Sequence, residues 1–236
     1  MSLLTVARNA AQMLGETSTV SVVLDLLDRR SDNRMAEQGM LSQAFLFCRI
    51  NRLPGDYLEF GLWRGRTFAY ARRMKRRYQL RSMKLWGFDS FQGLPAPPEH
   101  PDNIWGPGDF ACSEDEFRRI LRAKGFKQSE YELIPGYFHD SLNEHAHWRL
   151  QGRTAAIVYI DCDLYDSARD ALRFVHRYLV NGTILCFDDF YAYKGAPNQG
   201  EQLALREFLN EHPDVSVIPY LDFCPVGKSF IVRRSS

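Results

Sequence analysis

The stretch AAIVYIDCDLY, residues Ala155 to Tyr165, decides the fold, because its apolar run ends abruptly at two carboxylates, Asp161 and Asp163. A continuous apolar run of this length is typical of a strand that is buried on both faces of a parallel sheet. In an open α/β sheet, ligands bind outside the carboxyl ends of the strands. We therefore expect Asp161 and Asp163 to lie at a ligand site.

A second stretch repeats this pattern. TILCFDDF, Thr183 to Phe190, follows a helix-stopping Asn181-Gly182 and ends in Asp188 and Asp189. Two neighbouring strands of this kind bring four carboxylates to one edge of the sheet, where they repel one another and resist burial. Such a group needs water, protons or a cation to coexist. A hard divalent cation is favoured, because Mg²⁺ and Ca²⁺ prefer carboxylate oxygen.

Length and composition set the outline of the chain. Its 236 residues suit one large α/β domain over 1–236, with an N-terminal helical extension at 1–52 and a core at 53–236. Apolar residues at helical spacing predict short helices over 3–29 and another helix over 35–50. Lys and Arg number 30 against 29 Asp and Glu, so composition gives no case for a nucleic-acid partner.

The cysteines and the N-terminus indicate the compartment. The five cysteines lie far apart and form no Cys-x-x-Cys pair, which argues for reduced thiols and against a disulfide framework or a structural zinc site. The first residues lack the basic start and the unbroken apolar stretch of a secretory signal, and no run approaches membrane-spanning length. We expect a cytoplasmic protein with no membrane partner.

A glycine-bearing loop follows the first expected strand, Asp56 to Phe60. It reads GLWRG, Gly61 to Gly65, and leads into a helix over about 68–78. Glycines let the backbone approach a ligand, and a helix N-terminus offers free N–H groups. The Gly-x-x-x-Gly spacing fits neither the dinucleotide fingerprint nor the Walker phosphate loop. Glu59, next to the end of this buried strand, either binds a ligand or forms a salt bridge with a nearby arginine.

Basic residues are dense between Arg64 and Lys84. The run lacks interleaved aromatic residues beyond Tyr70 and Tyr78, and no other basic cluster supports it. This pattern favours a solvated outer face of a helix over a nucleic-acid-binding patch.

The second expected strand, Lys84 to Phe88, ends in Asp89-Ser90. An acidic residue about one βαβ step after a glycine loop is suited to accept two ribose hydroxyls, and the alternative is a turn residue or helix cap. The proline-rich loop Pro95 to Gly108, which carries Trp105, is long enough to act as a flap over the site.

The remaining segments continue the alternation of strands and helices. Ser113-Glu114-Asp115-Glu116 is a capping box that starts a helix. Further strands are expected at 131–135, 215–220 and 229–232, and further helices at 167–178 and 201–211. Several βα units followed by a terminal hairpin predict an α/β, doubly wound sheet whose last strand runs antiparallel.

Five motifs in this order resemble the macrocin O-methyltransferase family. The resemblance spans about Leu53 to Phe208 and implies a class I methyltransferase (Rossmann-like) fold with a mostly parallel seven-stranded sheet and extra N-terminal helices. It also implies S-adenosylmethionine as cofactor, Mg²⁺ or a similar divalent cation, and a hydroxyl acceptor of natural-product type. The motifs are DYLEFGLWRG (56–65), WGFDSFQGLP (86–95), IPGYFHDSL (134–142), YIDCDLYDS (159–167) and FDDF (187–190).

The resemblance also implies roles for single residues. Asp161, Asp188 and Asp189 match the metal ligands. If two adjacent substrate hydroxyls chelate the cation held there, Asp161 or Asp163 is expected to take the proton. Two departures lie in the fourth motif: Cys162 stands where the family usually has Gly, and Leu164 stands where catechol-type relatives carry a catalytic lysine. The expected cofactor contacts are Glu59, Gly61, Trp63, Asp89, Ser90, Phe138, His139, Asp161 and Cys162.

The expected function is therefore a metal-dependent O-methyltransferase that acts on a small sugar or phenolic molecule and forms a homo-oligomer. A nicotinamide-dependent oxidoreductase should show Gly-x-Gly-x-x-Gly, which this sequence lacks. A non-catalytic cofactor-binding or scaffold protein would not need the four-carboxylate edge. An RNA methyltransferase would use the basic helix after Thr67 and bind RNA in a salt-sensitive way.

Overall fold

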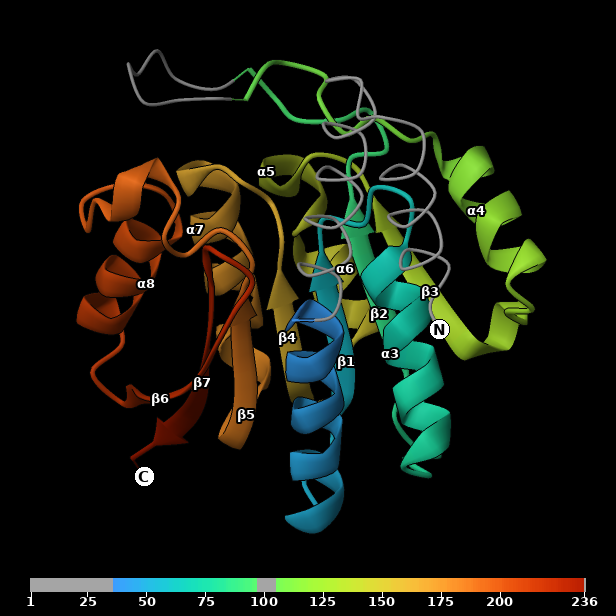
Figure 1. Ribbon diagram of the computed structural model, residues 1–236, viewed down its shortest axis with the longest axis horizontal. Coiled ribbons are helices and arrows are strands. Elements are labelled where there is room, and N and C mark those ends of the chain that lie inside the picture. Colours follow the sequence, from blue (N-terminus) through green and yellow to red (C-terminus); the bar gives the residue numbers. More distant parts are fainter. Residues whose placement is uncertain (1–35, 97–104, 236) are drawn as a thin grey trace, which may run out of the picture.

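The computed structural model describes residues 36–96 and 105–235. The helices predicted over 3–29, and the middle of the loop Pro95 to Gly108, lie outside these residues. Within them, one sheet is made of β1 (Asp56–Phe60), β2 (Leu85–Asp89), β3 (Tyr131–Pro135), β4 (Ala155–Ile160), β5 (Leu179–Phe187), β6 (Val215–Phe223) and β7 (Gly227–Arg234) (Figure 1).

Helices precede and connect these strands. A helix over 36–50 leads into β1, close to the predicted 35–50. The others are α3 (Arg66–Arg77), α4 (Glu114–Ala123), α5 (Phe138–Ser141), α6 (Glu144–Arg149), α7 (Tyr165–Val175) and α8 (Gly200–Glu211), with 3-10 turns η1 (Gln128–Glu130), η2 (His176–Tyr178) and η3 (Tyr193–Gly195).

The strand order is β3-β2-β1-β4-β5-β7-β6. β1 pairs in parallel with β2 and β4, β2 with β3, and β4 with β5, whereas β7 runs antiparallel to both β5 and β6. The predicted doubly wound sheet with an antiparallel last strand is confirmed. The order reverses between β1 and β4, so the crevice in which such folds bind ligands lies beside the ends of these two strands.

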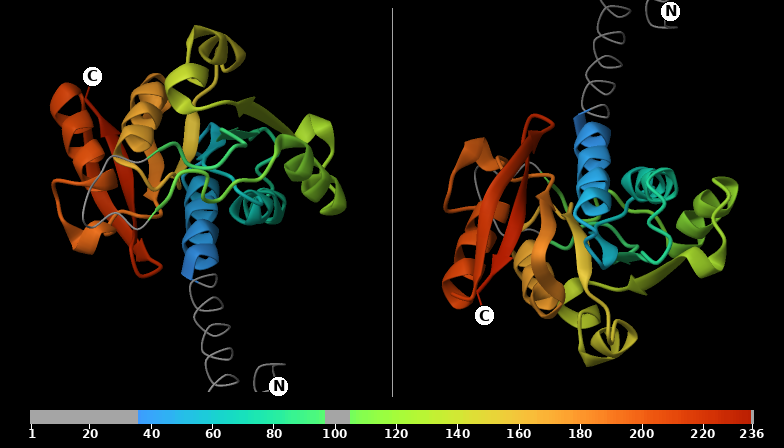
Figure 2. Two further views of the ribbon diagram at one scale, coloured as in Figure 1. Left: turned by 90° about the horizontal axis from the view of Figure 1, so that it is seen from above. Right: turned by 90° about the horizontal axis from the view of Figure 1, so that it is seen from below.

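Two apolar layers hold the sheet between helices. On one face α7 and α8 form one buried cluster with residues of β1, β4, β5 and β7, and Phe60, Phe174 and Phe208 belong to it. On the other face the helix over 36–50 packs beside α3 and α4. The buried side chains of this face include Phe68 of α3 and Phe117 of α4. Figure 2 shows these helices on opposite sides of the strands. The continuous apolar runs follow from this arrangement, because every residue of β1 and β4 is buried.

Two glycines of the GLWRG loop are required by close packing. Gly61 has a φ of 87°, and a Cβ there would lie 1.7 Å from the carbonyl oxygen of Asp161. Gly65 has a φ of 63°, and a Cβ would lie 2.7 Å from the ring of Phe117. Both positions need glycine for the protein's own backbone and core, whatever ligand lies beside them.

Two local predictions are wrong. Asn181-Gly182 does not stop a helix, because α7 already ends at Val175 and both residues lie inside β5, near an irregularity in the pairing with β4. Arg72 does not belong to a solvated helix face. Its side chain is buried and bonds the carboxylate of Glu130 and the carbonyl oxygen of Lys124.

Other predictions from the sequence concern the membrane, a helix start, the domain organisation and the oligomeric state. Among the described residues, no helix combines the length and the apolar character needed to cross a membrane. The Ser113 side chain caps α4 as predicted, since it accepts a hydrogen bond from the Glu116 N–H at 3.3 Å. The single-domain organisation and the homo-oligomer stay predictions.

Candidate functional site

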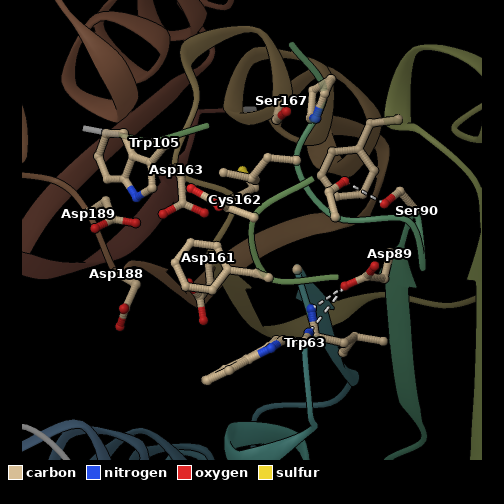
Figure 3. A pocket seen from close by; sticks show the side chains of 18 of the residues that line it. Trp63, Asp89, Ser90, Trp105, Asp161, Cys162, Asp163, Ser167, Asp188 and Asp189 are labelled. Carbon is tan, nitrogen blue, oxygen red and sulfur yellow. Dashed lines mark hydrogen bonds between the residues drawn. The ribbon is translucent and has the colours of Figure 1, made fainter. Parts of the chain in front are cut away.

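A cavity of about 370 Å³ lies at the carboxyl ends of β1, β2, β4 and β5. A cavity of this size can take a small molecule. Figure 3 shows Asp161, Asp163, Asp188 and Asp189 gathered on one side of it and Asp89 on the other. Its walls also include Gly61, Leu62, Trp63, Arg66, Ser90, Gly93, Leu94, Pro95, Trp105, Asp109, Phe110, Tyr137, Phe138, Cys162 and Ser167.

Three of the aspartates come within reach of one ion. Asp161, Asp188 and Asp189 each offer a carboxylate oxygen, and these oxygens all lie within 4.8 Å of one another. The sheet fixes their backbones: the Asp161 N–H donates to the Phe60 carbonyl at 2.8 Å, and the Asp188 N–H donates to the Ile160 carbonyl at 2.9 Å. The predicted meeting of two strand ends is therefore what the structure shows.

Tyr159 sets the orientation of one of these carboxylates. Its ring is buried in β4, and its hydroxyl donates to Asp188 Oδ1 at 2.5 Å. This bond uses one oxygen of Asp188 and leaves its remaining lone pairs for a ligand.

Asp163 completes the acidic wall in a strained conformation. Its φ is 61°, in the left-handed region that a non-glycine residue seldom adopts, and its side chain is buried. Its carboxyl group shares a hydrogen bond with that of Asp189. Backbone strain of this kind is found where a side chain must be held at a functional position.

Burial and mutual repulsion make these acidic groups harder to ionise. Burial, followed by the nearby carboxylates, raises the pKa of Asp161 and of Asp189 well above the usual value. Burial raises the pKa of Asp163 to about 7 and also raises that of Asp188, where the Tyr159 bond and Arg66 act in the opposite direction. A cluster of this kind attracts cations and binds protons when none is present.

Arg66 is the basic residue on the cavity wall. It is the first residue of α3, and its guanidinium forms an ion pair with Glu37 of the helix over 36–50. Glu37 is almost fully buried, whereas Arg66 is half-exposed. The helix before the core therefore positions the one basic side chain among the described residues that line this cavity.

The chemistry of the donors suits a hard divalent cation. Asp161, Asp188 and Asp189 supply only carboxylate oxygen, the ligand type of Mg²⁺ and Ca²⁺. A further carboxylate, Glu201, lies behind them, and its buried Oε1 atom has no hydrogen-bond partner among the residues that the structure describes. Three clustered carboxylates and a fourth with an unpaired oxygen fit a bound cation better than they fit an empty protein interior.

Glu59 lies in the core and outside the cavity wall. It is fully buried, Tyr57 donates to its Oε2 at 2.5 Å, and the hydroxyl of Thr67 donates to its Oε1. Within residues 36–96 and 105–235 no arginine pairs with Glu59, so the salt-bridge alternative is not what the described residues show. Its predicted contact with the cofactor stays a prediction.

Asp89 binds the glycine loop of the protein itself. Its Oδ2 accepts the N–H of Leu62 at 2.6 Å and that of Trp63 at 3.3 Å, and its Oδ1 accepts the N–H of Phe91 at 2.6 Å (Figure 3). The turn role weighed as an alternative is therefore present. A carboxylate has about four acceptor positions, so the predicted ribose contact still has room and stays a prediction.

The other predicted cofactor residues are divided between two neighbouring cavities. Gly61, Trp63, Ser90 and Cys162 line the cavity described above, and Phe138 lines both cavities. His139 lines only the second, which has a volume of about 280 Å³, and its side chain is 63% exposed.

Several side chains at the site carry no signal in the sequence. Arg66 reads as one more basic residue of a basic helix, and Glu201 reads as an ordinary acidic residue in the first turn of α8. Their roles depend on the ion pair with Glu37 and on a hydrogen bond across the loop after β5. Trp63 and Phe110 form an edge-to-face pair with ring centroids 5.6 Å apart on the cavity wall.

Comparison with known proteins places this site in a family. The chain is 31% identical over 149 residues to demethyldecarbamoylnovobiocin O-methyltransferase of Streptomyces niveus, a match that covers 59% of this chain and 54% of the relative. A second relative, the 4'-O-methyltransferase of 8-demethyl-8-(2,3-dimethoxy-alpha-L-rhamnosyl)-tetracenomycin-C from Streptomyces olivaceus, is 28% identical over 149 residues, with 58% and 54% covered. The chain thus spans about half the length of the curated relatives it matches.

The fold comparison and the family model agree. The structure of the O-methyltransferase NovP superposes with a TM-score of 0.70 at 24% identity, covering 85% of this chain and 81% of that one, which shows the class I methyltransferase fold. The model of the macrocin-O-methyltransferase (TylF) family matches residues 32–216, well over half of the sequence. The chain belongs to the macrocin O-methyltransferase family.

Proposed function

We propose that this chain is an S-adenosylmethionine-dependent O-methyltransferase that requires a divalent cation and methylates a hydroxyl group of a small sugar or phenolic molecule. The observation that carries this proposal is the meeting of Asp161, Asp188 and Asp189 on the wall of a cavity that the glycine loop also lines. The family assignment supports methyl transfer, and the rhamnosyl-bearing substrate named for one relative supports a sugar hydroxyl.

The cation would be held by Asp161, Asp188 and Asp189. When bound there, it supplies a Lewis acid that lowers the pKa of an acceptor hydroxyl and fixes its orientation. Around it, the chain fixes the geometry: Tyr159 holds Asp188 by a hydrogen bond, and the β4 and β5 backbones hold Asp161 and Asp188 in register.

Methyl transfer to a hydroxyl forms a C–O bond, breaks the sulfonium C–S bond and releases the hydroxyl proton. We assign the proton to a carboxylate oxygen of Asp163, because Asp163 lines the cavity beside the three-carboxylate group without belonging to it. Of the two aspartates expected to take the proton, Asp161 is committed to the cation. Alignment of acceptor and methyl carbon falls to the cavity walls.

The decisive experiment changes the cation site alone. Asp188→Ala is expected to lower turnover by at least about 10³-fold, because the metal supplies several kcal/mol of the barrier reduction, while cofactor affinity stays nearly unchanged. Release of S-adenosylhomocysteine from a panel of glycosides and phenols measures turnover, and isothermal titration measures cofactor binding. Asp115→Ala, an exposed acidic residue on α4, is the matched control.

Four outcomes would contradict the proposal. Loss of cofactor binding in Asp188→Ala would show that Asp188 does not have the role of a cation ligand. Full turnover in the presence of a chelator would show that the reaction does not require a divalent cation. Cofactor binding by the wild type without release of S-adenosylhomocysteine from any acceptor would favour a non-catalytic cofactor-binding protein, and tight, salt-sensitive RNA binding would favour an RNA methyltransferase.

A further inference from the structure

Glu201 is a buried carboxylate that the proposed reaction does not use. It is the second residue of α8, and only 1% of its surface is exposed. Its Oε2 accepts the backbone N–H of Asp189 at 3.0 Å, across the loop that follows β5. This bond connects the start of α8 to the backbone of a candidate cation ligand.

The second oxygen of Glu201 has no partner. Its Oε1 atom is buried and, in the part of the chain that the structure describes, accepts no hydrogen bond. An unsatisfied buried acceptor destabilises the folded state, and more strongly if it is charged. The acidic groups that act on it electrostatically include Asp163, Asp188 and Asp189, which only accept hydrogen bonds when ionised, so the ionised cluster offers Glu201 no donor.

The missing donors match the water shell of a cation. Mg²⁺ demands six ligands and usually keeps several waters, and three carboxylates leave coordination positions open. We propose that Glu201 is a positioning residue of the cation site, which holds Asp189 through the backbone and accepts hydrogen bonds from the water of a bound divalent cation. This role rests on the cation dependence proposed above.

The arrangement has the form of an outer layer around metal ligands. Groups that orient first ligands or accept from metal-bound water commonly change metal affinity by about 10–100-fold when they are replaced. Glu201 does not line the cavity, so it is not expected to touch the methyl acceptor. A purely structural Glu201 would hold the loop equally well with or without a cation.

Direct metal binding tests this role. Mn²⁺ is the probe, and its dissociation constant is measured from the free-ion electron paramagnetic resonance signal of the full chain. Glu201→Gln keeps an oxygen for the Asp189 N–H and replaces the other oxygen by an amide N–H₂ group, which cannot accept. We expect the Mn²⁺ dissociation constant to rise at least about tenfold. Glu211→Gln, an exposed carboxylate on the same helix, should stay within about twofold of wild type.

The outcomes separate this role from the function on which it rests. Wild-type binding of Mn²⁺ with an unchanged constant in Glu201→Gln overturns the role of Glu201 and leaves the cation site intact. Absence of Mn²⁺ binding by the wild type overturns both. If Glu201→Gln does not fold, Glu201→Asp keeps the charge but shortens the side chain; weakened binding supports the role, and an unchanged constant overturns it.

Discussion

Carboxylates at the two ends of the sheet differ in their partners. At the amino end of β1, Asp56 is fully buried, yet both of its oxygens are occupied: the Lys84 N–H donates at 2.7 Å, Trp86 Nε1 at 2.8 Å and Arg153 Nε at 2.6 Å. At the carboxyl end of β4, Asp161 faces Asp188 and Asp189 and has no basic partner within the described ranges.

This difference shows which end stabilises and which end binds. At the amino end each buried charge is neutralised by a guanidinium and by hydrogen bonds, so the charges hold β1 to its neighbours at little net cost. At the carboxyl end the charges oppose one another, and a protein keeps such an arrangement only where an external partner completes it. Substitutions at the two ends should therefore have effects of opposite sign on stability.

The largest effect is expected at the paired end. Asp56→Ala should lower the free energy of unfolding by about 3–5 kcal/mol, because it leaves the Arg153 guanidinium and the Trp86 N–H without their acceptor. Urea unfolding measures the change, and Asp222→Ala, an exposed partner of Lys228, is the control. A loss below about 1 kcal/mol would show that the paired end does not depend on this bridge. Residual folded protein should still bind Mn²⁺.

Glu59 is an intermediate case, since its partners within residues 36–96 and 105–235 are the hydroxyl groups of Tyr57 and Thr67. Burial raises the pKa of Glu59 from its ordinary value of 4.5 to about 8, so the folded state favours the protonated acid. A folded pKa above the unfolded one means that its contribution to stability is complete below pH 4.5 and is lost as the pH rises to 8. Glu59→Gln replaces the titrating carboxyl group by an amide, which does not titrate in this pH range.

The measurement compares urea unfolding of wild type and Glu59→Gln at pH 5 and pH 8. Wild type should lose on the order of 2–3 kcal/mol more than the variant across this interval. A parallel loss in both proteins would assign the pH dependence to other groups. Tyr57→Phe, which removes the hydroxyl donor at 2.5 Å and leaves the carboxyl group in place, is the control for packing.

Most features of the carboxyl edge of the sheet could be predicted from the sequence, but few of the contacts that surround this edge could be. Apolar runs that end in aspartates predicted β4, β5 and the meeting of Asp161 with Asp188, because both signals are local and the parallel sheet aligns strand ends. The reason for Gly61 was not predictable, since the atom that excludes a Cβ is the carbonyl oxygen of Asp161, one hundred residues away in the sequence.

The same limit explains the residues that the sequence misplaced. Arg72 has the pattern of a solvated residue, but its guanidinium reaches Glu130, whose position depends on how α4 folds back on α3. Glu201 looks like an acidic residue at a helix start, and only its contact with Asp189 shows that it faces a cluster of its own charge. Long-range pairing of polar side chains leaves no periodic trace in a single sequence.

The smallest effect, and the one that tests the comparison most directly, is expected at the unpaired end. Asp161→Asn should raise the free energy of unfolding of the cation-free protein by on the order of 1 kcal/mol, because it removes one of several like charges at the cavity wall. The same change should abolish the stabilisation that millimolar Mg²⁺ gives wild type, since a ligand stabilises only the state that binds it. Thermal unfolding in chelator and in Mg²⁺ measures both effects, with Asp115→Asn as control. Destabilisation of the cation-free protein by Asp161→Asn would mean that this carboxylate is paired after all, and that the two ends of the sheet are built alike.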